Sequence, residues 1–289
     1  MLASEFMPAG ACLVCHGTRS RVLFRKGGKD FVRCEACGLV WLDPMPTAAE
    51  ISAYYDQSYQ DGIYEPYAAA ETIRRLIAEH RLTAVRPHAR PGRWLDVGAA
   101  TGHFVEAAAR AGIAAEGCEI SASAVARARA RGLTMHHSSV EDFSPAAPYD
   151  TITAFDVLEH LREPRAFLDR LRGWLAPGGT LALTLPNVSS VYPRLLMGRH
   201  WFYYAPSDHL HYFDPRTITR LLGDHGFADT RVGRAYKPLT ISYVALQLRQ
   251  FTPLLGRVAT VLAGTLPSAL RERPIRFYIG EMMVVAHST

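Results

Sequence analysis

Residues 94–102 read WLDVGAATG, an apolar run that ends at the acid Asp96 and then breaks into small residues. A phosphate-binding P-loop requires a lysine after its last glycine, and no lysine follows Gly102. A dinucleotide-binding loop requires a third glycine, and His103 stands at that position. Asp96 would also repel a pyrophosphate, because like charges repel. The loop therefore favours a ligand with a cationic end.

Strand-like and helix-like segments alternate on the C-terminal side of this loop. The strand-like runs are RWLDVG, AAEGCEI, TMHHSS, YDTITAF, TLALTLP, ADTRVGR and EMMVVAHS, and the expected helices span 102–111, 122–131, 164–175 and 215–224. This alternation predicts an α/β fold with a doubly wound, Rossmann-like sheet of seven mostly parallel strands. Ligands of such sheets bind at the carboxyl ends of the strands, where Asp96 lies.

The composition sets limits on the function. The chain has 289 residues, is 48% hydrophobic and carries a net charge of +5, which predicts a globular protein with one large core and a small accessory module. A basic balance is compatible with nucleic acid, a phosphorylated substrate or an anionic membrane, and selects none of them. The sequence shows no secretory signal and no apolar run of the ~18 residues that a spanning helix needs. We therefore expect a cytoplasmic protein.

Four of the five cysteines form two pairs near the N-terminus, Cys12-x2-Cys15 and Cys34-x2-Cys37. This spacing predicts a structural zinc ion bound by four thiolates, and the surrounding sequence resembles a zinc ribbon over residues 1–45. Two disulfides or a redox pair remain the alternative. The fifth cysteine, Cys118, is expected to be a buried small hydrophobic residue.

The remaining chain divides into a connector and a catalytic region. Residues 1–6, MLASEF, are typical of an expression-vector remnant and are left out of the fold prediction. Residues 46–90 form a tyrosine-rich connector followed by a helix, and residues 91–289 form the main domain. Two insertions are expected in that domain, near 188–214 and 238–274. The first is rich in aromatic residues and is expected to build the acceptor pocket. The second is apolar with spaced arginines, which suits a lid, a dimer face or a membrane contact.

The stretch Asp96 to Gly102, DVGAATG, resembles motif I of class I S-adenosylmethionine-dependent methyltransferases. That family uses the acid to hold the methionine end of its cofactor, which carries an ammonium and a sulfonium. Ala100 departs from the usual middle glycine. The N-terminal ribbon, VLEHL and SDHLHYFDPRTITRLLGDHGF resemble a family 23-like subgroup, whose members modify sugars, lipid-linked glycans, quinone precursors and other natural products.

The resemblance also implies a set of cofactor-binding residues. Glu119 ends the second strand of the domain, where a carboxylate can accept hydrogen bonds from both ribose hydroxyls. The segment 139–143 is expected to line the adenine, with Glu141 or Asp142 accepting from its amino group. The full set of implied cofactor residues is Asp96, Gly98, Ala100, Gly102, Glu119, Ile120, Val140, Glu141 and Phe155.

Methyl transfer is an in-line displacement, so the acceptor atom must lie roughly 3 Å from the methyl group and lose its proton where it carries one. The candidate catalytic residues are His160, His209 and Glu159, and His160 is the preferred base because it follows the fourth strand. A capping or loop-holding role for His160 remains the alternative. His211 precedes an apolar pair and is expected to belong to the core.

A divalent metal is a competing use of the same side chains. Asp156, Glu159 and His160 fall within one helical turn, and Asp208 and His209 offer further ligands. Some quinone-ring O-methyltransferases that this chain resembles use a Glu-His pair for a divalent ion. The sequence leaves the base and the metal open.

The sequence therefore predicts S-adenosylmethionine-dependent methyl transfer to a hydroxyl of a small molecule, a sugar or a lipid-linked glycan. An RNA methyltransferase that uses its ribbon to bind RNA is the alternative, although no lysine-rich face or stacking platform supports nucleic-acid binding. A noncatalytic cofactor-binding scaffold is a third reading. The loop argues against an oxidoreductase.

Overall fold

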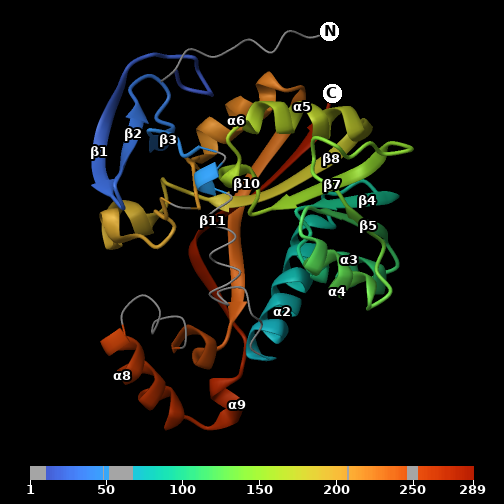
Figure 1. Cartoon of the computed structure of the whole chain (residues 1–289). Helices are drawn as coiled ribbons and strands as arrows, with labels where there is room; N and C mark the ends of the chain where they lie inside the picture. The colour runs from blue at the N-terminus through green and yellow to red at the C-terminus, as the bar shows by residue number, and fades with distance from the viewer. Residues whose placement is uncertain (1–10, 48, 52–67, 207, 246–252) are drawn as a thin grey trace.

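The computed structural model describes residues 11–47, 49–51, 68–206, 208–245 and 253–289. A seven-stranded sheet, ordered β10-β11-β8-β7-β4-β5-β6, forms its centre (Figure 1). Its strands are β4 (Arg93–Val97), β5 (Ala114–Glu119), β6 (Met135–His137), β7 (Tyr149–Phe155), β8 (Leu175–Pro186), β10 (Phe227–Leu239) and β11 (Ile275–Ser288). Strands β4 to β8 are parallel, and β11 runs antiparallel to both β8 and β10. This order confirms the predicted doubly wound sheet, and it places the reversal of strand order between β4 and β7.

Helices cover both faces of this sheet. They are α2 (Ala68–Val85), α3 (His103–Arg110), α4 (Ala122–Arg129), α5 (Pro164–Trp174) and α6 (Pro215–Asp224). Helices α5 and α6 lie on one face and α2, α3 and α4 on the other (Figure 1). The four helices expected after the glycine loop are confirmed, with ends that differ by at most two residues.

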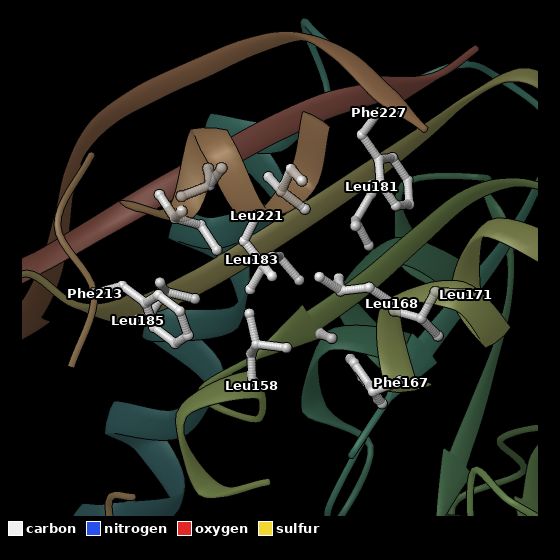
Figure 2. Packing of buried hydrophobic residues seen from close by; sticks show 14 of the residues in the cluster. Leu158, Phe167, Leu168, Leu171, Leu181, Leu183, Leu185, Phe213, Leu221 and Phe227 are labelled. Carbon is white, nitrogen blue, oxygen red and sulfur yellow. The ribbon is translucent and has the colours of Figure 1, made fainter. Parts of the chain in front are cut away.

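The alternation of side chains along β8 divides the core into two layers. Leu181, Leu183 and Leu185 belong to the cluster that includes α5 and α6, as Figure 2 shows. The intervening Ala182 belongs to a second cluster with residues of α2 and α3. Neighbouring residues of a strand point to opposite faces, so a strand buried on both sides reads as a continuous apolar run. In the sequence this strand reads TLALTLP, apolar apart from two buried threonines.

The N-terminal region forms a second, four-stranded sheet. Strands β1 (Ser20–Lys26), β2 (Lys29–Cys34) and β3 (Val40–Asp43) are antiparallel, and β9 (His211–Tyr212) adds the fourth strand by pairing with β3. The fourth strand comes from the first predicted insertion and was not predicted. A hydrophobic cluster covers this junction and contains Phe31, Val40, Leu42, Trp201, Tyr204, Leu210 and Tyr212.

The second insertion lies at the far end of a long hairpin. Strands β10 and β11 have 13 and 14 residues and extend beyond the predicted runs. They lead to α8 (Pro253–Gly264) and α9 (Ser268–Arg271), which project away from the sheet (Figure 1). No helix in the described part of the chain is long and apolar enough to cross a membrane. The tyrosine-rich stretch 52–67, the opening residues 1–10 and residues 246–252 lie outside the described residues.

Candidate active site

A cavity of about 470 Å³ opens at the carboxyl ends of β4, β5 and β7, next to the reversal of strand order. Its size is typical of a small-molecule or cofactor site. The lining residues are Arg74, Ile77, Ala78, Arg81, Asp96, Gly98, Ala99, Ala100, Thr101, His103, Phe104, Glu119, Ser123, Ala124, Arg127, Phe155, Asp156 and Lys237. The structure therefore brings most of the predicted loop and two of the three predicted cofactor acids, Asp96 and Glu119, to one cavity.

The loop after β4 shows why its residues are small. Gly98 has a φ of 71°, and a Cβ there would lie 2.6 Å from Cγ2 of Val157. Ala100, which replaces the usual glycine, has a φ of 45°. The backbone thus keeps a left-handed conformation at Ala100, at a cost of about 1 kcal/mol. Gly102 occupies the N-cap position of α3 and does not line the cavity.

Glu119 is held at the end of β5 by two backbone donors. The backbone N–H of Ala100 donates to Oε2 of Glu119, and that of Ser121 donates to Oε1, each over 2.8 Å. Ser121 also caps α4, as expected, because its hydroxyl accepts from the backbone N–H of Ala124. The carboxylate is therefore fixed at the cavity before any ligand binds.

Asp96 is more buried than Glu119. Its side chain is 6% exposed, and its Oδ1 accepts a hydrogen bond of 2.6 Å from the Thr153 hydroxyl. Burial raises the pKa of Asp96 to about 7. A cationic ligand in the cavity would favour the ionised form, so ligand binding and ionisation of Asp96 should be coupled.

Replacing Asp96 by Asn is expected to separate stability from cofactor affinity. The folded-state pKa of Asp96 lies about 3 units above its usual value, so its protonated form contributes stability below pH 4 that is lost as the pH rises to about 7. At pH 8 the Asn variant should be more stable than the wild type by up to about 4 kcal/mol, since it avoids the buried charge. At pH 4, close to the usual pKa of an aspartate, the two should unfold nearly alike. Urea denaturation without cofactor checks this.

The matched control for Asp96→Asn is Asp229→Asn, at an exposed carboxylate that does not line the cavity. This variant should follow the wild type at both pH values. Titration calorimetry at pH 8 should in addition show weaker S-adenosylmethionine binding for Asp96→Asn only. Equal stabilities of Asp96→Asn and the wild type at pH 8 would contradict the argument from burial.

The remaining predicted cofactor residues have different positions. Phe155 lines the cavity, whereas Ile120, Val140 and Glu141 do not. Ile120 is 69% exposed beside Glu119, so its side chain is free to cover a bound ring. Asp142 accepts a hydrogen bond of 2.8 Å from the Ser139 hydroxyl, within its own turn.

Four cations that the sequence did not predict also line the cavity: Arg74, Arg81, Arg127 and Lys237. Arg74 and Arg81 are seven residues apart on α2, a spacing that places both on one helical face. Arg81 pairs with Asp156, and Lys237 lies 3.9 Å from the same carboxylate. Burial would raise the pKa of Asp156, but these two cations hold it below its usual range. The helical spacing of Arg74 and Arg81 could have indicated that they lie on the same side of α2. No pattern in the sequence indicated that Lys237 lies at the cavity.

The three predicted catalytic side chains meet in one buried group. Glu159, His160 and His209 each offer a ligand atom, and these atoms lie within 4.8 Å of one another. Nδ1 of His160 lies 2.9 Å from Oδ1 of Asp208, and Nδ1 of His209 lies 2.9 Å from the Tyr203 carbonyl. Asp208 therefore orients His160.

Asp156 and His211, which the sequence also offered, lie outside this group. Asp156 faces Arg81 and Lys237, so the structure does not place it among the ligand atoms in the described part of the chain. His211 lies buried in β9, as expected of a core residue.

The protonation states of this group differ. Burial opposes the charge on His160, but the hydrogen bond that its ring donates to Asp208 and the charge of Glu159 raise its pKa to about 9. Burial raises the pKa of Glu159 to about 8. Burial and the charge of His160 lower the pKa of His209 to about 4. Near neutral pH, His209 is therefore the neutral imidazole and His160 is protonated, which favours His209 over His160 as a base.

Tyr203 and Lys237 connect this group to the cavity. The ammonium of Lys237 lies 3.2 Å from the Tyr203 hydroxyl, and the Tyr203 ring stacks on His209 with 5.6 Å between centroids. Glu159, His160 and His209 themselves are not among the cavity-lining residues.

The aromatic residues of the first insertion only partly meet the expectation of an acceptor pocket. Trp201 and Tyr204 are 0% and 5% exposed and pack against the N-terminal sheet. Tyr203 instead faces the polar residues, since its hydroxyl donates to Glu281. Trp201 and Tyr204 pack in the core instead of lining a pocket, because the N-terminal sheet supplies an apolar surface for them.

The four paired cysteines converge as the spacing predicted. Cys12 and Cys37 have their sulfurs 3.4 Å apart, and so do Cys15 and Cys34. A disulfide would require about 2.05 Å, and all four cysteines are free. Burial would raise the pKa of Cys34, but backbone hydrogen bonds from Cys37 and Ala36 lower it to about 7. The fifth cysteine, Cys118, is buried in β5 as expected.

Comparison with known sequences identifies the family. A profile of methyltransferase family 23, described as a methyltransferase domain, matches residues 68–232, more than half of the chain. The chain belongs to this family of S-adenosylmethionine-dependent methyltransferases. The matched range contains the glycine loop, Glu119 and the Glu159–His160–His209 group.

Curated relatives share part of this region. A ubiquinone biosynthesis O-methyltransferase of Nitrobacter winogradskyi is 35% identical over 101 residues, which cover 33% of this chain and 39% of the relative. Another of the same name from Aromatoleum aromaticum is 26% identical over 165 residues, covering 52% and 70%. The chain spans about 40% of the length of the first curated relatives it matches.

Solved structures share the fold. A S-adenosylmethionine-dependent methyltransferase of Archaeoglobus fulgidus has a TM-score of 0.51 at 18% identity, covering 74% of this chain and 94% of that protein. A phosphoethanolamine N-methyltransferase of Haemonchus contortus, solved with S-adenosylhomocysteine, has a TM-score of 0.55 at 15% identity, covering 90% and 63%. At these identities the likeness concerns the fold alone.

Proposed function

We propose that this protein transfers a methyl group from S-adenosylmethionine to a hydroxyl oxygen of a small-molecule acceptor. The observation that carries the proposal is the cavity where β4 and β7 diverge, with Asp96 and Glu119 on its wall. A buried acid of raised pKa suits the cationic methionine end of the cofactor, and a preoriented carboxylate suits its ribose. The hydroxyl acceptor is supported by the O-methyltransferase names of the curated relatives.

The cofactor is proposed to lie along the glycine loop. Its ammonium pairs with Asp96, and its ribose hydroxyls donate to Glu119. Arg74 is the proposed partner of its carboxylate, because Arg81 is already paired with Asp156 and Arg127 lies on α4, which follows the ribose acid Glu119. Phe155, Asp156 and Lys237, which also line the cavity, would border the methyl group of the cofactor.

Glu119→Ala is expected to weaken S-adenosylmethionine binding by about 2 kcal/mol or more, roughly 30-fold in Kd, because two charge-assisted hydrogen bonds are lost. Glu119→Gln, which keeps one acceptor oxygen, should fall between the wild type and Glu119→Ala. Titration calorimetry measures both. The exposed Glu163, replaced by Ala, is the control and should bind like the wild type. An unchanged Kd for Glu119→Ala would remove Glu119 from the cofactor site.

The group Glu159, His160 and His209 is proposed to hold a divalent cation. The donor set fits such an ion, since two imidazoles and a carboxylate converge and each histidine uses its other nitrogen to contact a carboxylate or a carbonyl. Oε2 of Glu159 is buried and has no hydrogen-bond partner among the described residues. A bound cation would supply Lewis acidity that lowers the pKa of the acceptor hydroxyl. Asp208 and the Tyr203 carbonyl orient the two imidazoles for this role.

The Cys12–Cys15–Cys34–Cys37 group is proposed to hold a structural zinc ion. Four sulfurs close together, with one thiol of lowered pKa, fit a closed tetrathiolate site that leaves no open coordination position. The proposed division of the chain keeps residues 1–45 as the ribbon, 46–90 as the connector and 91–289 as the methyltransferase domain.

Labelled cofactor tests the reaction. A lysate fractionated into small molecules, lipids, RNA and protein is incubated with the enzyme and S-adenosylmethionine carrying an isotopically labelled methyl group. Mass spectrometry should find the label on a hydroxyl oxygen in the small-molecule or lipid fraction. Label confined to RNA would instead support an RNA methyltransferase, and no labelled product would support a noncatalytic scaffold.

A further inference from the structure

The segment 253–276, named the arm here, carries an unusual concentration of exposed apolar side chains. It contains α8 and α9 and lies at the far end of the β10–β11 hairpin (Figure 1). Six of the twelve exposed large hydrophobic residues in the described part of the chain lie on it: Val258, Val261, Leu262, Leu266, Leu270 and Ile275. Val261 is 70% exposed and Leu262 is 61% exposed. Scattered apolar residues are ordinary on a surface, but a cluster marks a contact surface.

The arm is also basic. Its four arginines and single glutamate give it a net charge of +3. Glu272 is already paired with Arg271 over 3.0 Å and accepts a hydrogen bond from Ser242. Arg257, Arg273 and Arg276 have no acidic partner among the described residues. Three exposed guanidinium groups therefore flank the apolar side chains.

A shallow groove brings the exposed apolar side chains and the arginines together. It is lined by Ile241, Leu266, Leu270, Arg273, Pro274, Ile275 and Arg276. Apolar side chains beside guanidinium groups match the boundary between acyl chains and anionic headgroups.

We propose that the arm docks on the surface of an anionic lipid membrane, with its apolar side chains in the acyl boundary and its arginines at the headgroups. Charge complementarity selects this occupant. A second copy of the chain, docked patch to patch, would bring two surfaces of charge +3 together, whereas an anionic membrane complements them. This proposal does not rest on the proposed reaction, because lipid binding requires no turnover.

Docking of the arm would bring the cavity close to the lipid surface. Phe277 pairs with Lys237, and Arg276 pairs with Pro238. The last residue of the arm, Arg276, therefore directly precedes the strand partner of Lys237, which lines the cavity. An acceptor with an apolar tail could then remain in the membrane while its head reaches the cavity.

Vesicle flotation of the full-length protein tests the proposal. Vesicles of phosphatidylcholine containing a third of phosphatidylglycerol should carry the protein upward at low salt, and vesicles of phosphatidylcholine alone should not. The triple variant Arg257→Gln, Arg273→Gln, Arg276→Gln should bind the anionic vesicles about 100-fold more weakly. Val261→Ser with Leu262→Ser should also weaken binding, although all charges remain.

The control variant Arg21→Gln, Arg216→Gln, Arg220→Gln removes the same charge at exposed positions away from the arm. It should bind the anionic vesicles like the wild type. Wild-type affinity for S-adenosylmethionine shows that each variant is folded. Equal loss of binding in the control and arm triples, or no binding of the wild type, would overturn the proposal. So would a dimer in solution that Val261→Ser with Leu262→Ser converts to a monomer, since the occupant would then be a second copy.

Discussion

Cys34→Ser is expected to unfold the N-terminal sheet and to abolish binding of one zinc ion per chain. Structural zinc contributes about 10 to 16 kcal/mol to the folding of small zinc modules, and a ribbon of this size has too little core to fold without it. Cys34 is 1% exposed and lies at the end of β2, so its loss removes both a ligand and a core side chain. Elemental analysis should give one zinc per wild-type chain and almost none for the variant.

Cys118→Ser provides the matched control for the zinc site. It changes a buried cysteine that lies outside the group of four, and zinc content should stay at one per chain. Proteolysis should cut Cys34→Ser between residues 11 and 47 and leave Cys118→Ser intact there. Wild-type protein that contains no zinc after purification under reducing conditions, yet resists the protease, would defeat the prediction.

Glu159→Gln is expected to lower turnover by a factor on the order of 10² to 10⁴ while S-adenosylmethionine affinity stays nearly unchanged. The carboxylate is the one anionic ligand of the proposed cation, and an amide holds a divalent ion far less well. Chelator should lower wild-type turnover by a similar factor, and added divalent ion should restore it. The variant should not recover with added ion. Steady-state turnover and calorimetry measure the two quantities separately.

Histidine variants separate the metal from a general base. A cation requires both His160 and His209, so either alanine variant should be as damaging as Glu159→Gln. If His209 acts alone as a base, His209→Ala should lower turnover and chelator should have no effect. Full turnover in both histidine variants without any chelator effect would mean that positioning alone carries the reaction. Glu163→Gln, at an exposed position outside the cavity, is the control.

The elements of the domain followed from local sequence because each one matches a simple pattern. The run around Leu183 is apolar apart from two threonines and is buried on both sides, and the four helices carry their apolar residues at helical spacing. The outer halves of β10 and β11 escaped prediction because they lie beyond the main core, where alternation of polar and apolar residues is weak. Strand β9 escaped because two residues that pair with a distant strand leave no local signal.

Some residues of the candidate site were likewise predictable from local sequence, and others were not. Asp96 and Glu119 were predictable because each stands at a strand end beside a glycine turn or a helix cap. Lys237 was not, since it reaches the cavity from a strand whose place in the sheet depends on long-range pairing. Glu141 was expected near the adenine, but its exposed position outside the cavity depends on the turn of segment 139–143. The sequence indicated that Glu159, His160 and His209 belong together but could not show how Asp208 and burial set their charges.

The pairing of β3 with β9 has a practical consequence for anyone who trims this protein. A clone that begins at residue 46 would carry the complete family match, yet it would lack Phe31, Val40 and Leu42. Trp201 and Tyr204 would then face water, beside a strand with unpaired backbone groups. Such an edge is a template for aggregation. A shortened clone should therefore begin upstream of Cys12. The two sheets are separate in space, but the N-terminal one is completed by a strand from the second half of the chain, so no cut along the sequence divides them.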